Sequence, residues 1–563
     1  MTPVPSAALP FSAAARAAHL ASLGEGTWDM LVVGGGVTGA GIARDAALRG
    51  LRVALVDAGD FGGGTSSRSS RLVHGGLRYL ETFQFRLVFE ASAERRRLLK
   101  LAPHLIHPLE FVFPVFRRGP VSLPKLLAGM WLYDGLSLFG NIRSHRMLGP
   151  AGTLAEEPRL RREGLTGAAV YFDAAVDDAR LALANVRAAH EAGAATVSHA
   201  EVAAFLTGPS GKVEGARIRD RRTGTETEVR ARVTVNATGP WSDAVRRLAQ
   251  PSAAPRLRPT KGVHIMVRAD RLGNRHAVTF LSPIDGRVMF VLPQGDFSYV
   301  GTTDTDFTGD PGTAEADAKD VDYLVASANA IYPDANLTTG DVVSTWAGIR
   351  PLLAPPRGAG SESATPREHE IWRDASGLLN IAGGKLTTYR VMALQAADRA
   401  AEILRAEHGI QSRPSTTDLL PLPGAPTEPW DAFLARVTAD AQTLGLSAGT
   451  AMHLARSYGA EADALLAAIR ADPGLGRQLV DGRPYVWAEV DHAVRAEMAV
   501  SLEDILRRRM QLFYETEDGG RAIARAVAER MATEPGLNWT ADDVAREVAV
   551  YDAAVERTRG FRR

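Results

Sequence analysis

One short glycine-rich segment near the start of the chain constrains the fold more than any other feature. The apolar run Met30–Val33 is typical of a buried parallel strand. A G-x-G-x-x-G motif follows it directly, with its glycines at Gly34, Gly36 and Gly39. In this spacing the first glycine permits a tight turn, the second lets a pyrophosphate approach the backbone, and the third lets the next helix pack closely on the strand. The segment therefore predicts a dinucleotide-binding turn.

A second strand and an acidic residue complete this pattern. We expect a helix over Ala40–Arg49, whose first N–H groups face the phosphates, and a second strand over Arg52–Val56. Asp57 ends that strand, 23 residues after Gly34. A carboxylate at this place accepts hydrogen bonds from ribose hydroxyls and disfavours a 2′-phosphate, which argues against NADP. The pattern predicts a Rossmann-like α/β domain but does not separate FAD from NAD.

Three further segments narrow the choice to one family. A strand-like run ends in Asn236–Trp241 (NATGPW), which resembles the second FAD motif of two-dinucleotide-domain flavoproteins. Thr65–Glu81 reads TSSRSSRLVHGGLRYLE, and Gly383–Arg390 reads GGKLTTYR. Together with the glycine motif, and in the same order along the chain, these segments closely resemble FAD-dependent glycerol-3-phosphate dehydrogenases of the respiratory, aerobic type. The similarity runs from about Asp29 to Arg390, and the C-terminal part also looks like the extra domain of that family.

The resemblance implies the fold class and the domain order. The fold class is α/β, with a Rossmann-like FAD-binding domain of the D-amino-acid-oxidase type, a mixed-sheet substrate (cap) domain, and a C-terminal helical domain. A proline-rich stretch, Pro421–Pro429, is typical of a linker before the last of these. The expected parts are an N-terminal extension over 1–27, the oxidoreductase over 28–415 with its substrate part mainly in 100–160 and 246–352, and the helical domain over 416–563.

The resemblance also implies the cofactor and the residues along it. The cofactor is FAD, and it is not linked through a cysteine, because the chain has none. For any single serine of the Thr65–Glu81 segment, an ordinary polar loop is the alternative. The expected FAD-binding residues are Gly34, Gly36, Val37, Thr38, Gly39, Asp57, Thr65, Ser66, Ser67, Ser70, Leu72, His74, Gly75, Gly76, Val202, Ala237, Gly239, Trp241, Gly384, Lys385, Leu386 and Thr387.

A histidine on a strand-like segment is the candidate base. Along Thr260–Val267 the side chains of Val263, Ile265 and Val267 share one face, whereas His264 lies on the other face and can line a cavity. A histidine with a pKa near its usual value of about 6.5 can take a hydroxyl proton as a hydride leaves the carbon. A purely structural histidine is the alternative.

Arginine and lysine side chains are candidates for binding a phosphate. Arg350 lies in a Gly-Ile-Arg-Pro segment, and its planar fork of donors suits a phosphate dianion. Related amino-acid oxidases use a similarly placed arginine on a substrate carboxylate. We expect Pro351 to end strand pairing in a special turn, and a salt-bridged arginine at a strand end is the alternative. Arg78 and Lys385 are expected to help hold the phosphate.

Two other residues near these motifs have expected roles. Tyr79 can donate a hydrogen bond to the substrate or to the product ketone, and a packed aromatic is the alternative. Asp304 follows Gly-Thr-Thr and is predicted to be a turn residue that bonds its own loop.

These residues predict oxidation of sn-glycerol 3-phosphate to dihydroxyacetone phosphate, with hydride transfer from C2 to FAD. By resemblance the electrons then pass to a quinone, which requires contact with a membrane surface. The segment Phe111–Phe139 mixes large apolar residues with Arg117, Arg118 and Lys125, and such a segment can lie among lipid headgroups. A buried hairpin or core helix is the alternative.

Two other classes of function stay open. One is a glycerol-3-phosphate oxidase that uses oxygen, or another FAD oxidoreductase of the amino-acid-oxidase type. Such oxidases tend to carry an insertion, for which the 86 residues from His264 to Arg350 and the 35 from Arg350 to Lys385 leave no room. The other is a non-catalytic or RNA-modifying flavoprotein. With 65 basic and 65 acidic residues the net charge is zero, which argues against nucleic acid as a partner.

Composition and local patterns exclude several further chemistries. Without cysteine, a reduced flavin cannot pass electrons to a dithiol pair. His104 and His107 lack a third ligand, so no metal is expected. We expect Asp177–Asp178 to cap a helix, and Arg507–Arg509 to lie on a solvated helix face.

The expected location is the cytoplasm or, peripherally, the inner face of the cell membrane. No apolar run reaches the about 18 residues that a spanning helix needs. A homodimer is one arrangement that the sequence leaves open.

Overall fold

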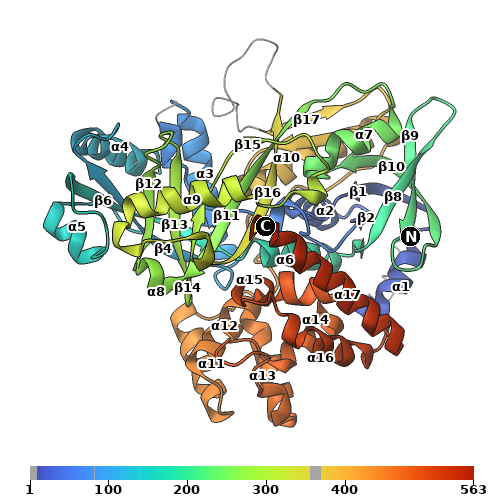
Figure 1. The fold of residues 1–563 in the computed structure, drawn as a ribbon. Helices are drawn as coiled ribbons and strands as arrows, with labels where there is room; N and C mark the ends of the chain where they lie inside the picture. Colours follow the sequence, from blue (N-terminus) through green and yellow to red (C-terminus); the bar gives the residue numbers. More distant parts are fainter. Residues whose placement is uncertain (1–8, 81–82, 138–139, 355–368, 563) are drawn as a thin grey trace.

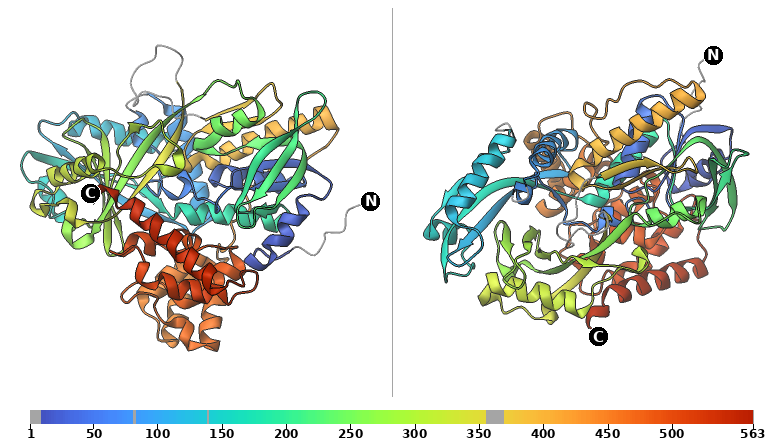
Figure 2. Two further views of the ribbon diagram at one scale, coloured as in Figure 1. Left: turned by 45° about the vertical axis from the view of Figure 1, so that its right-hand side comes forward. Right: turned by 90° about the horizontal axis from the view of Figure 1, so that it is seen from above.

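The computed structural model describes residues 9–80, 83–137, 140–354 and 369–562, with the backbone alone at Arg78 and Tyr79. Two sheets lie side by side, and a group of C-terminal helices, orange to red, covers them from below (Figures 1 and 2). The large cavity described below opens where these three parts meet.

The first sheet carries the predicted glycine motif. Its strand order is β17-β18-β10-β1-β2-β7, with β9 on β10 and β8 on β9, and the five strands from β18 to β7 run parallel. The two strands predicted over Met30–Val33 and Arg52–Val56 are confirmed as β1 and β2. The bounds are β1 (Thr27–Val33), β2 (Val53–Val56), β7 (Ala195–Val197), β8 (Ala200–Thr207), β9 (Val213–Asp220), β10 (Glu226–Asn236), β17 (His369–Arg373) and β18 (Leu379–Gly383).

Three helices pack around the parallel strands. They are α2 (Val37–Leu48), α6 (Asp178–Glu191) and α10 (Tyr389–His408). Met30 and Val32 of β1 share one apolar core with side chains of all three helices. Burial among helices explains why these strands are continuous apolar runs. At the start of α6, Asp177 caps the helix as predicted, because its carboxylate accepts a hydrogen bond of 3.0 Å from the backbone N–H of Arg180.

The second sheet is mixed, as predicted. Its order is β15-β11-β14-β13-β12-β4-β6-β3, with β16 on β11 and β5 on β6, and β4 and β12 form its parallel pair. Val263, Ile265 and Val267 belong to one apolar core, and Met266 belongs to another, which confirms the predicted alternation. The bounds are β3 (Leu72–Val73), β4 (Ile106–Phe116), β5 (Arg146–Leu148), β6 (Leu165–Val176), β11 (Leu257–Arg268), β12 (Ala277–Leu281), β13 (Val288–Gln294), β14 (Phe297–Gly301), β15 (Thr305–Asp306) and β16 (Val342–Leu353).

Shorter helices surround the two sheets. Among them, α9 packs on the apolar core that holds Val263, whereas α3 and α4 contact each other, with α3 beside β4 and α4 beside β6 (Figure 1). Within the described residues, no helix is both long and apolar enough to cross a membrane. The bounds are α1 (Ala13–Ser22), α3 (Phe85–Leu101), α4 (Leu123–Leu136), α5 (Pro150–Glu156), α7 (Ser242–Ala249), α8 (Ala269–Leu272) and α9 (Ala318–Ile331).

The C-terminal part is helical, as predicted. It consists of α-helices joined by short turns and one π-helical turn, η11. The bounds are α11 (Trp430–Thr443), α12 (Ala448–Tyr458), α13 (Ala462–Ala471), α14 (Trp487–Ala496), η11 (Asp504–Arg509), α15 (Leu512–Glu515), α16 (Arg521–Ala532) and α17 (Ala541–Thr558).

Two local expectations were wrong. Arg507–Arg509 do not lie on a solvated face, because η11 buries all three side chains and pairs them with acidic groups such as Asp60 and Glu503. Pro351 does not end strand pairing: β16 continues to Leu353, with Pro351 opposite Pro259 of β11.

Candidate active site

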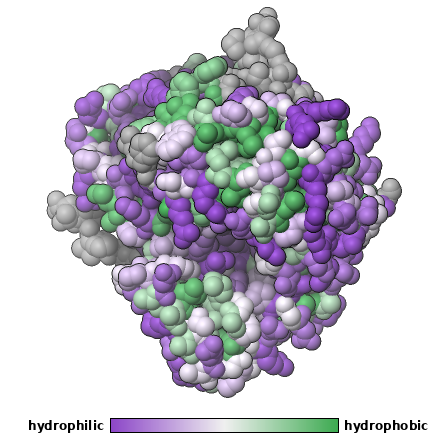
Figure 3. All heavy atoms as spheres, turned by 90° about the vertical axis from the view of Figure 1, so that its left-hand side faces the viewer, coloured by the Kyte–Doolittle hydropathy of each residue, from purple (hydrophilic) through white to green (hydrophobic). Residues whose placement is uncertain are grey.

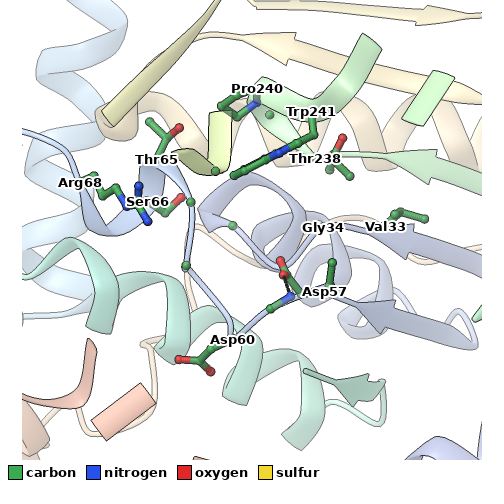
Figure 4. Close-up of a pocket in the computed structure, with 18 of the residues that line it drawn as sticks. Val33, Gly34, Asp57, Asp60, Thr65, Ser66, Arg68, Thr238, Pro240 and Trp241 are labelled. Carbon is green, nitrogen blue, oxygen red and sulfur yellow. Dashed lines mark hydrogen bonds between the residues drawn. The ribbon is translucent and has the colours of Figure 1, made fainter. Parts of the chain in front are cut away.

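The glycine turn lies at the carboxyl end of β1 and forms one wall of the cavity (Figure 4). Gly34 has a φ of 105°, a conformation that favours glycine. A Cβ on Gly39 would lie 1.8 Å from the Gly34 carbonyl oxygen, so only glycine lets α2 pack this closely on the turn. The backbone N–H of Val37 donates a hydrogen bond of 2.9 Å to Ser66 Oγ, which joins the turn to the Thr65–Glu81 segment.

The cavity has a volume of about 1450 Å³, with walls from the first sheet, from the Thr65–Glu81 segment and from the C-terminal helices. Most of the predicted FAD-binding residues line it. These are Gly34, Gly36, Val37, Thr38, Asp57, Thr65, Ser66, Val202, Ala237, Gly239, Trp241, Gly384, Lys385 and Leu386.

The other predicted FAD-binding residues lie behind this wall. Ser70 contacts His264, and the backbone N–H of His74 donates to Thr387 Oγ1 at 3.2 Å. Gly75 lies so close to the Tyr133 hydroxyl that a Cβ would be 2.1 Å from it. The residues in this second group are Gly39, Ser67, Ser70, Leu72, His74, Gly75, Gly76 and Thr387.

Asp57 occupies the place predicted for a ribose-binding carboxylate. Its Oδ2 accepts a hydrogen bond of 2.6 Å from the Gly35 N–H, and its Oδ1 accepts one of 2.8 Å from the Gly59 N–H. Burial raises the pKa of the Asp57 carboxyl from 3.8 to about 6, although these two hydrogen bonds act in the opposite direction. The carboxylate is therefore held rigidly at the edge of the cavity (Figure 4).

These residues fit FAD. The N-terminus of α2 and the glycine turn offer N–H groups to a pyrophosphate, and Asp57 lies where a ribose hydroxyl would bind. At the other end of the cavity, Gly383 and Gly384 have a φ of 83°, and they open the wall beside Lys385 and Leu386. Such a wall suits the flat ring system of a flavin, because no side chain projects from it at these positions.

His264 lies behind the inner end of the cavity. It is on β11, opposite Gly301 of β14 and Trp346 of β16, and only 3% of its surface is exposed. Nε2 lies 2.9 Å from Ser70 Oγ, and Nδ1 has no hydrogen-bond partner among the described residues. Ser70 directly follows Ser69, which lines the cavity. The histidine is therefore one residue away from the cavity wall.

The charge state of His264 follows from its surroundings. Burial holds the pKa of the imidazole well below its usual value of 6.5, and the positive charges of Arg350 and Arg71 lower it further. At neutral pH the imidazole is therefore uncharged, as a proton acceptor must be.

Arg350 lies on the same face of the sheet as His264, four residues along β16 from Trp346. Its Nη1 donates to Asp304 Oδ1 at 3.0 Å, and its Nη2 donates to the Thr303 carbonyl at 3.2 Å. A Cβ on Gly262 would lie 2.5 Å from Nη2, so the glycine gives the guanidinium its room. Asp304, which we expected to bond its own loop, thus orients Arg350, and it also pairs with Arg287 at 3.4 Å.

The remaining candidates are Arg78, Tyr79 and Lys385. The backbone of Arg78 and Tyr79 lies in a short 3₁₀ turn, η2 (Leu77–Leu80), and both side chains are outside the described part of the chain. Lys385 lines the cavity beside Leu386. A metal site was not expected, and among the described residues there is no cluster of acidic or histidine side chains that could hold one.

Sequence reasoning missed the part of the cavity wall that comes from the C-terminal helices. Ser501, Glu503, Arg508, Glu547 and Tyr551 line it, together with others of the same segment. No local pattern marks them, because each faces the cavity only through packing between segments far apart in sequence. The adjacent arginines at 507–509 are a visible run of charge, but such a run is normally solvated and does not by itself indicate a buried ion-pair cluster.

The fold and the cavity define an FAD-dependent oxidoreductase. A family model described as "FAD dependent oxidoreductase" matches residues 29–399, and one described as "C-terminal domain of alpha-glycerophosphate oxidase" matches residues 415–544. A solved glycerol-3-phosphate dehydrogenase from Bacillus halodurans, complexed with FAD, superposes with a TM-score of 0.80 at 32% identity, over 97% of this chain and 98% of that one.

Curated relatives extend over nearly the whole chain. A glycerol-3-phosphate dehydrogenase from Mycobacterium leprae is 41% identical over 542 residues, which are 96% of this chain and 90% of that protein. An alpha-glycerophosphate oxidase from Streptococcus pneumoniae is 34% identical and covers 97% of this chain and 98% of its own. The chain belongs to the family of FAD-dependent glycerol-3-phosphate dehydrogenases, which confirms the predicted family, fold class and cofactor.

Proposed function

We propose that the protein oxidises sn-glycerol 3-phosphate to dihydroxyacetone phosphate and passes the electrons to a quinone. The observation that carries this proposal is the placement of a buried, uncharged histidine and an oriented arginine on one face of β11 and β16, directly behind the FAD cavity. Bound FAD supplies the acceptor for the C2 hydride. The names of the relatives support glycerol 3-phosphate as the substrate.

In this proposal His264 is the general base. As the C2–H bond breaks and its electron pair leaves with the hydrogen, the hydroxyl proton passes to the imidazole and the C2–O bond becomes a carbonyl. An imidazole that stays uncharged near neutral pH is ready to accept that proton. Ser70 and Trp346 hold the ring in place from two sides.

Arg350 binds the phosphate in this proposal. Its guanidinium is held by Asp304 and by the Thr302–Thr303 turn, so little orientational freedom is lost when the substrate binds. Lys385 adds positive charge at the cavity wall, and Arg78 assists with the phosphate. Tyr79 donates a hydrogen bond to the substrate oxygen at C2.

One observation favours a quinone over oxygen as the acceptor. The alignment with the streptococcal oxidase runs over 606 positions, more than the 563 residues of this chain, so that oxidase carries residues that this chain lacks. The absence of cysteine leaves no internal dithiol, so the electrons must pass to a separate acceptor, and this holds equally for a quinone and for oxygen.

An exposed apolar surface supports contact with a membrane. We define the α3/α4 patch as Phe83, Phe85, Phe89, Leu127, Trp131 and Leu132. Phe83 is 78% exposed and Trp131 is 59% exposed, and apolar side chains gather on the upper part of this face of the molecule (Figure 3). Arg86 and Lys125 are exposed on the same two helices. Large apolar side chains beside cations suit an anionic lipid surface, here the inner face of the cell membrane.

The substrate is tested by mixing the yellow holoenzyme anaerobically with glycerol 3-phosphate and following the flavin absorbance. We expect bleaching with glycerol 3-phosphate and none with unphosphorylated glycerol at the same concentration. Equal bleaching with both, or none with either, contradicts the substrate assignment. With the substrate established, a soluble quinone analogue should reoxidise the flavin faster than air does, and peroxide formed at the full turnover rate would favour the oxidase.

Membrane contact is tested by sedimentation with vesicles that contain anionic phospholipid. We expect Trp131→Asp to lower the bound fraction several-fold, because it places a charge in the α3/α4 patch. Ile284→Asp is the matched control, since Ile284 is 57% exposed but lies outside the patch. Equal binding by both variants contradicts this surface.

A further inference from the structure

The geometry points to a role for the C-terminal helices in holding FAD. We infer that Arg508 and Arg509 act as positioning residues, which fix the loop after Asp57 through the carboxylate of Asp60 and so retain the ribose end of the cofactor. This goes beyond the oxidation of glycerol 3-phosphate and does not depend on which substrate is used.

Asp60 joins the loop after Asp57 to the π-helical turn η11 of the C-terminal helices. Its side chain points away from the glycine turn, toward the ribbon of the C-terminal segment (Figure 4). Arg508 Nε and Arg509 Nη1 each donate to Oδ2 at 2.5 Å, and Arg509 Nη2 donates to Oδ1 at 3.0 Å. Asp60 lines the cavity, but only 2% of its surface is exposed, so these ion pairs are buried.

A second contact reaches the same end of the cavity. Asp504, one turn before Arg508, accepts a hydrogen bond of 3.3 Å from His199 Nε2. The backbone N–H of His199 in turn donates to the Gly59 carbonyl at 2.7 Å. His199 and Gly59 both line the cavity. We call residues 57–64 the Asp57 loop. The π-helical turn η11 therefore contacts this loop directly through Asp60 and indirectly through His199.

Backbone hydrogen bonds hold the start of the Asp57 loop: the N–H of Asp57 donates to the Val197 carbonyl at 3.1 Å, and the Asp57 carbonyl accepts from the Ala200 N–H at 2.6 Å. Residues 57–64 form no strand or helix, and the hydrogen bond from the Gly62 N–H to the Gly35 carbonyl, at 3.0 Å, ties them to the glycine turn. Removing one partner of a buried charge pair strongly destabilises the protein, because the remaining charge is left uncompensated. Loss of either arginine or of Asp60 should therefore loosen the part of the loop that follows Asp57, while Asp57 keeps its own bonds to Gly35 and Gly59.

A variant of Arg509 can distinguish a positioning role from direct contact with FAD. Arg508 lines the cavity and can contact FAD itself, whereas Arg509 does not line it. Arg509 also donates to the Glu497 carbonyl at 2.8 Å, and Glu497 keeps a second partner in Arg180. An effect of Arg509 on FAD is therefore indirect, and Asp60, which lines the cavity and accepts two hydrogen bonds from Arg509, provides the route that we infer.

The experiment measures FAD release from the full-length holoenzyme, followed by the fluorescence of the freed flavin after dilution. The variants are Asp60→Asn, Arg509→Met, the double variant and Arg509→Lys. We expect Asp60→Asn and Arg509→Met each to release FAD about tenfold faster or more. The double variant should release it no faster than the faster single variant, because both changes remove the same contact. Arg509→Lys, which keeps the charge but loses the fork, should lie between wild type and Arg509→Met.

Glu461→Gln is the matched control. It removes an ion pair of 2.7 Å between Glu461 and Arg187 that also joins the C-terminal helices to α6, but neither residue lines the cavity. We expect its FAD release to stay within about twofold of wild type. The inference is overturned if Asp60→Asn releases FAD at the wild-type rate or more slowly, as simple charge attraction to the pyrophosphate would require. It is also overturned if the single effects multiply in the double variant, or if Glu461→Gln matches them. Should Asp60→Asn fail to fold, Arg509→Lys decides by the same criterion.

Discussion

Trp346 stacks on His264, with the two ring centroids 4.9 Å apart and the ring planes 12° from parallel. The indole N–H donates to the Ser69 carbonyl at 3.1 Å, in the segment whose next residue, Ser70, contacts the imidazole. Tyr514 of the C-terminal helices also contacts Trp346, with the two ring centroids 5.6 Å apart. The imidazole is thus buried, and the side chains that hold it come from three segments far apart in the sequence.

Trp346→Leu should slow flavin reduction more than it weakens substrate binding. Loss of the stacked ring lets the imidazole move, and a displacement of about 1 Å can lower the rate about 100-fold. We expect a fall of 10-fold or more in the rate of flavin reduction, measured by anaerobic stopped flow, with the apparent substrate affinity changed by less than about threefold. Trp346→Phe keeps an aromatic ring and should retain most of the rate. A pure loss of affinity in Trp346→Leu would show that Trp346 does not position the base.

The acid limb of the pH profile of kcat/KM for flavin reduction should lie below pH 6.5, the usual pKa of a histidine. Because burial lowers the pKa of folded His264, the imidazole stays uncharged as the pH falls through 6.5. The unfolded chain takes up a proton there, so this group's contribution to stability is complete above pH 6.5 and declines as the pH falls below it. We expect kcat/KM for flavin reduction, measured with FAD saturating, to stay level from pH 8 to 6.5. An acid limb centred at or above pH 6.5 that is absent in His264→Asn would contradict this.

Binding of FAD should weaken below pH 6 through Asp57. The folded pKa of this carboxyl is raised from 3.8 to about 6, and the ionised form is the one that accepts hydrogen bonds from ribose. Affinity for FAD should therefore fall up to tenfold per pH unit below about 6. The same shift makes the folded apoprotein bind more protons than the unfolded chain, so the contribution of Asp57 to apoprotein stability is lost as the pH rises from about 4 to 6.

This prediction is measured by titrating the apoprotein with FAD between pH 5 and 8. Asp57→Asn is the control, because an amide does not titrate. Its affinity should be low and nearly independent of pH across this range. If the mutant keeps the wild-type pH dependence, another group is responsible.

Arg350→Met should weaken substrate binding with little effect on the rate at saturation. Removing a charge-assisted contact to phosphate is worth about 1.5–3 kcal/mol, or roughly 10- to 100-fold in the apparent dissociation constant. Unphosphorylated glycerol, at concentrations high enough to bind, should be affected much less. A variant that loses the rate of flavin reduction but keeps its affinity for glycerol 3-phosphate would exchange the roles proposed for Arg350 and His264.

The first sheet shows which structural features follow from local sequence. Strand β1, the glycine turn and Asp57 lie within about 30 residues, and each is required by short-range sterics or hydrogen bonding. The alternation around His264 is equally local, because side chains on a strand point to opposite faces in turn. These features were predicted correctly from residue types and spacing alone.

Arg350 and Arg508 show where such reasoning ends. Pro351 is a plausible strand end, yet β16 continues because Pro351 lies opposite Pro259, and that pairing depends on a strand almost 100 residues earlier. Arg508 lies 448 residues from Asp60, and a run of three arginines is normally solvated. No feature of the sequence near Arg508 indicates that a carboxylate is buried beside this arginine.

The sequence by itself determined the family, the cofactor and the chemical groups at the site, since those depend on residue types at short spacing. Tertiary structure alone decided which charges are buried, that His264 is stacked on Trp346 and held uncharged, and that the C-terminal helices complete the FAD cavity. The physical reason is that a pKa, an ion pair or a cavity wall depends on desolvation and on neighbours in space, which the chain supplies from segments hundreds of residues apart.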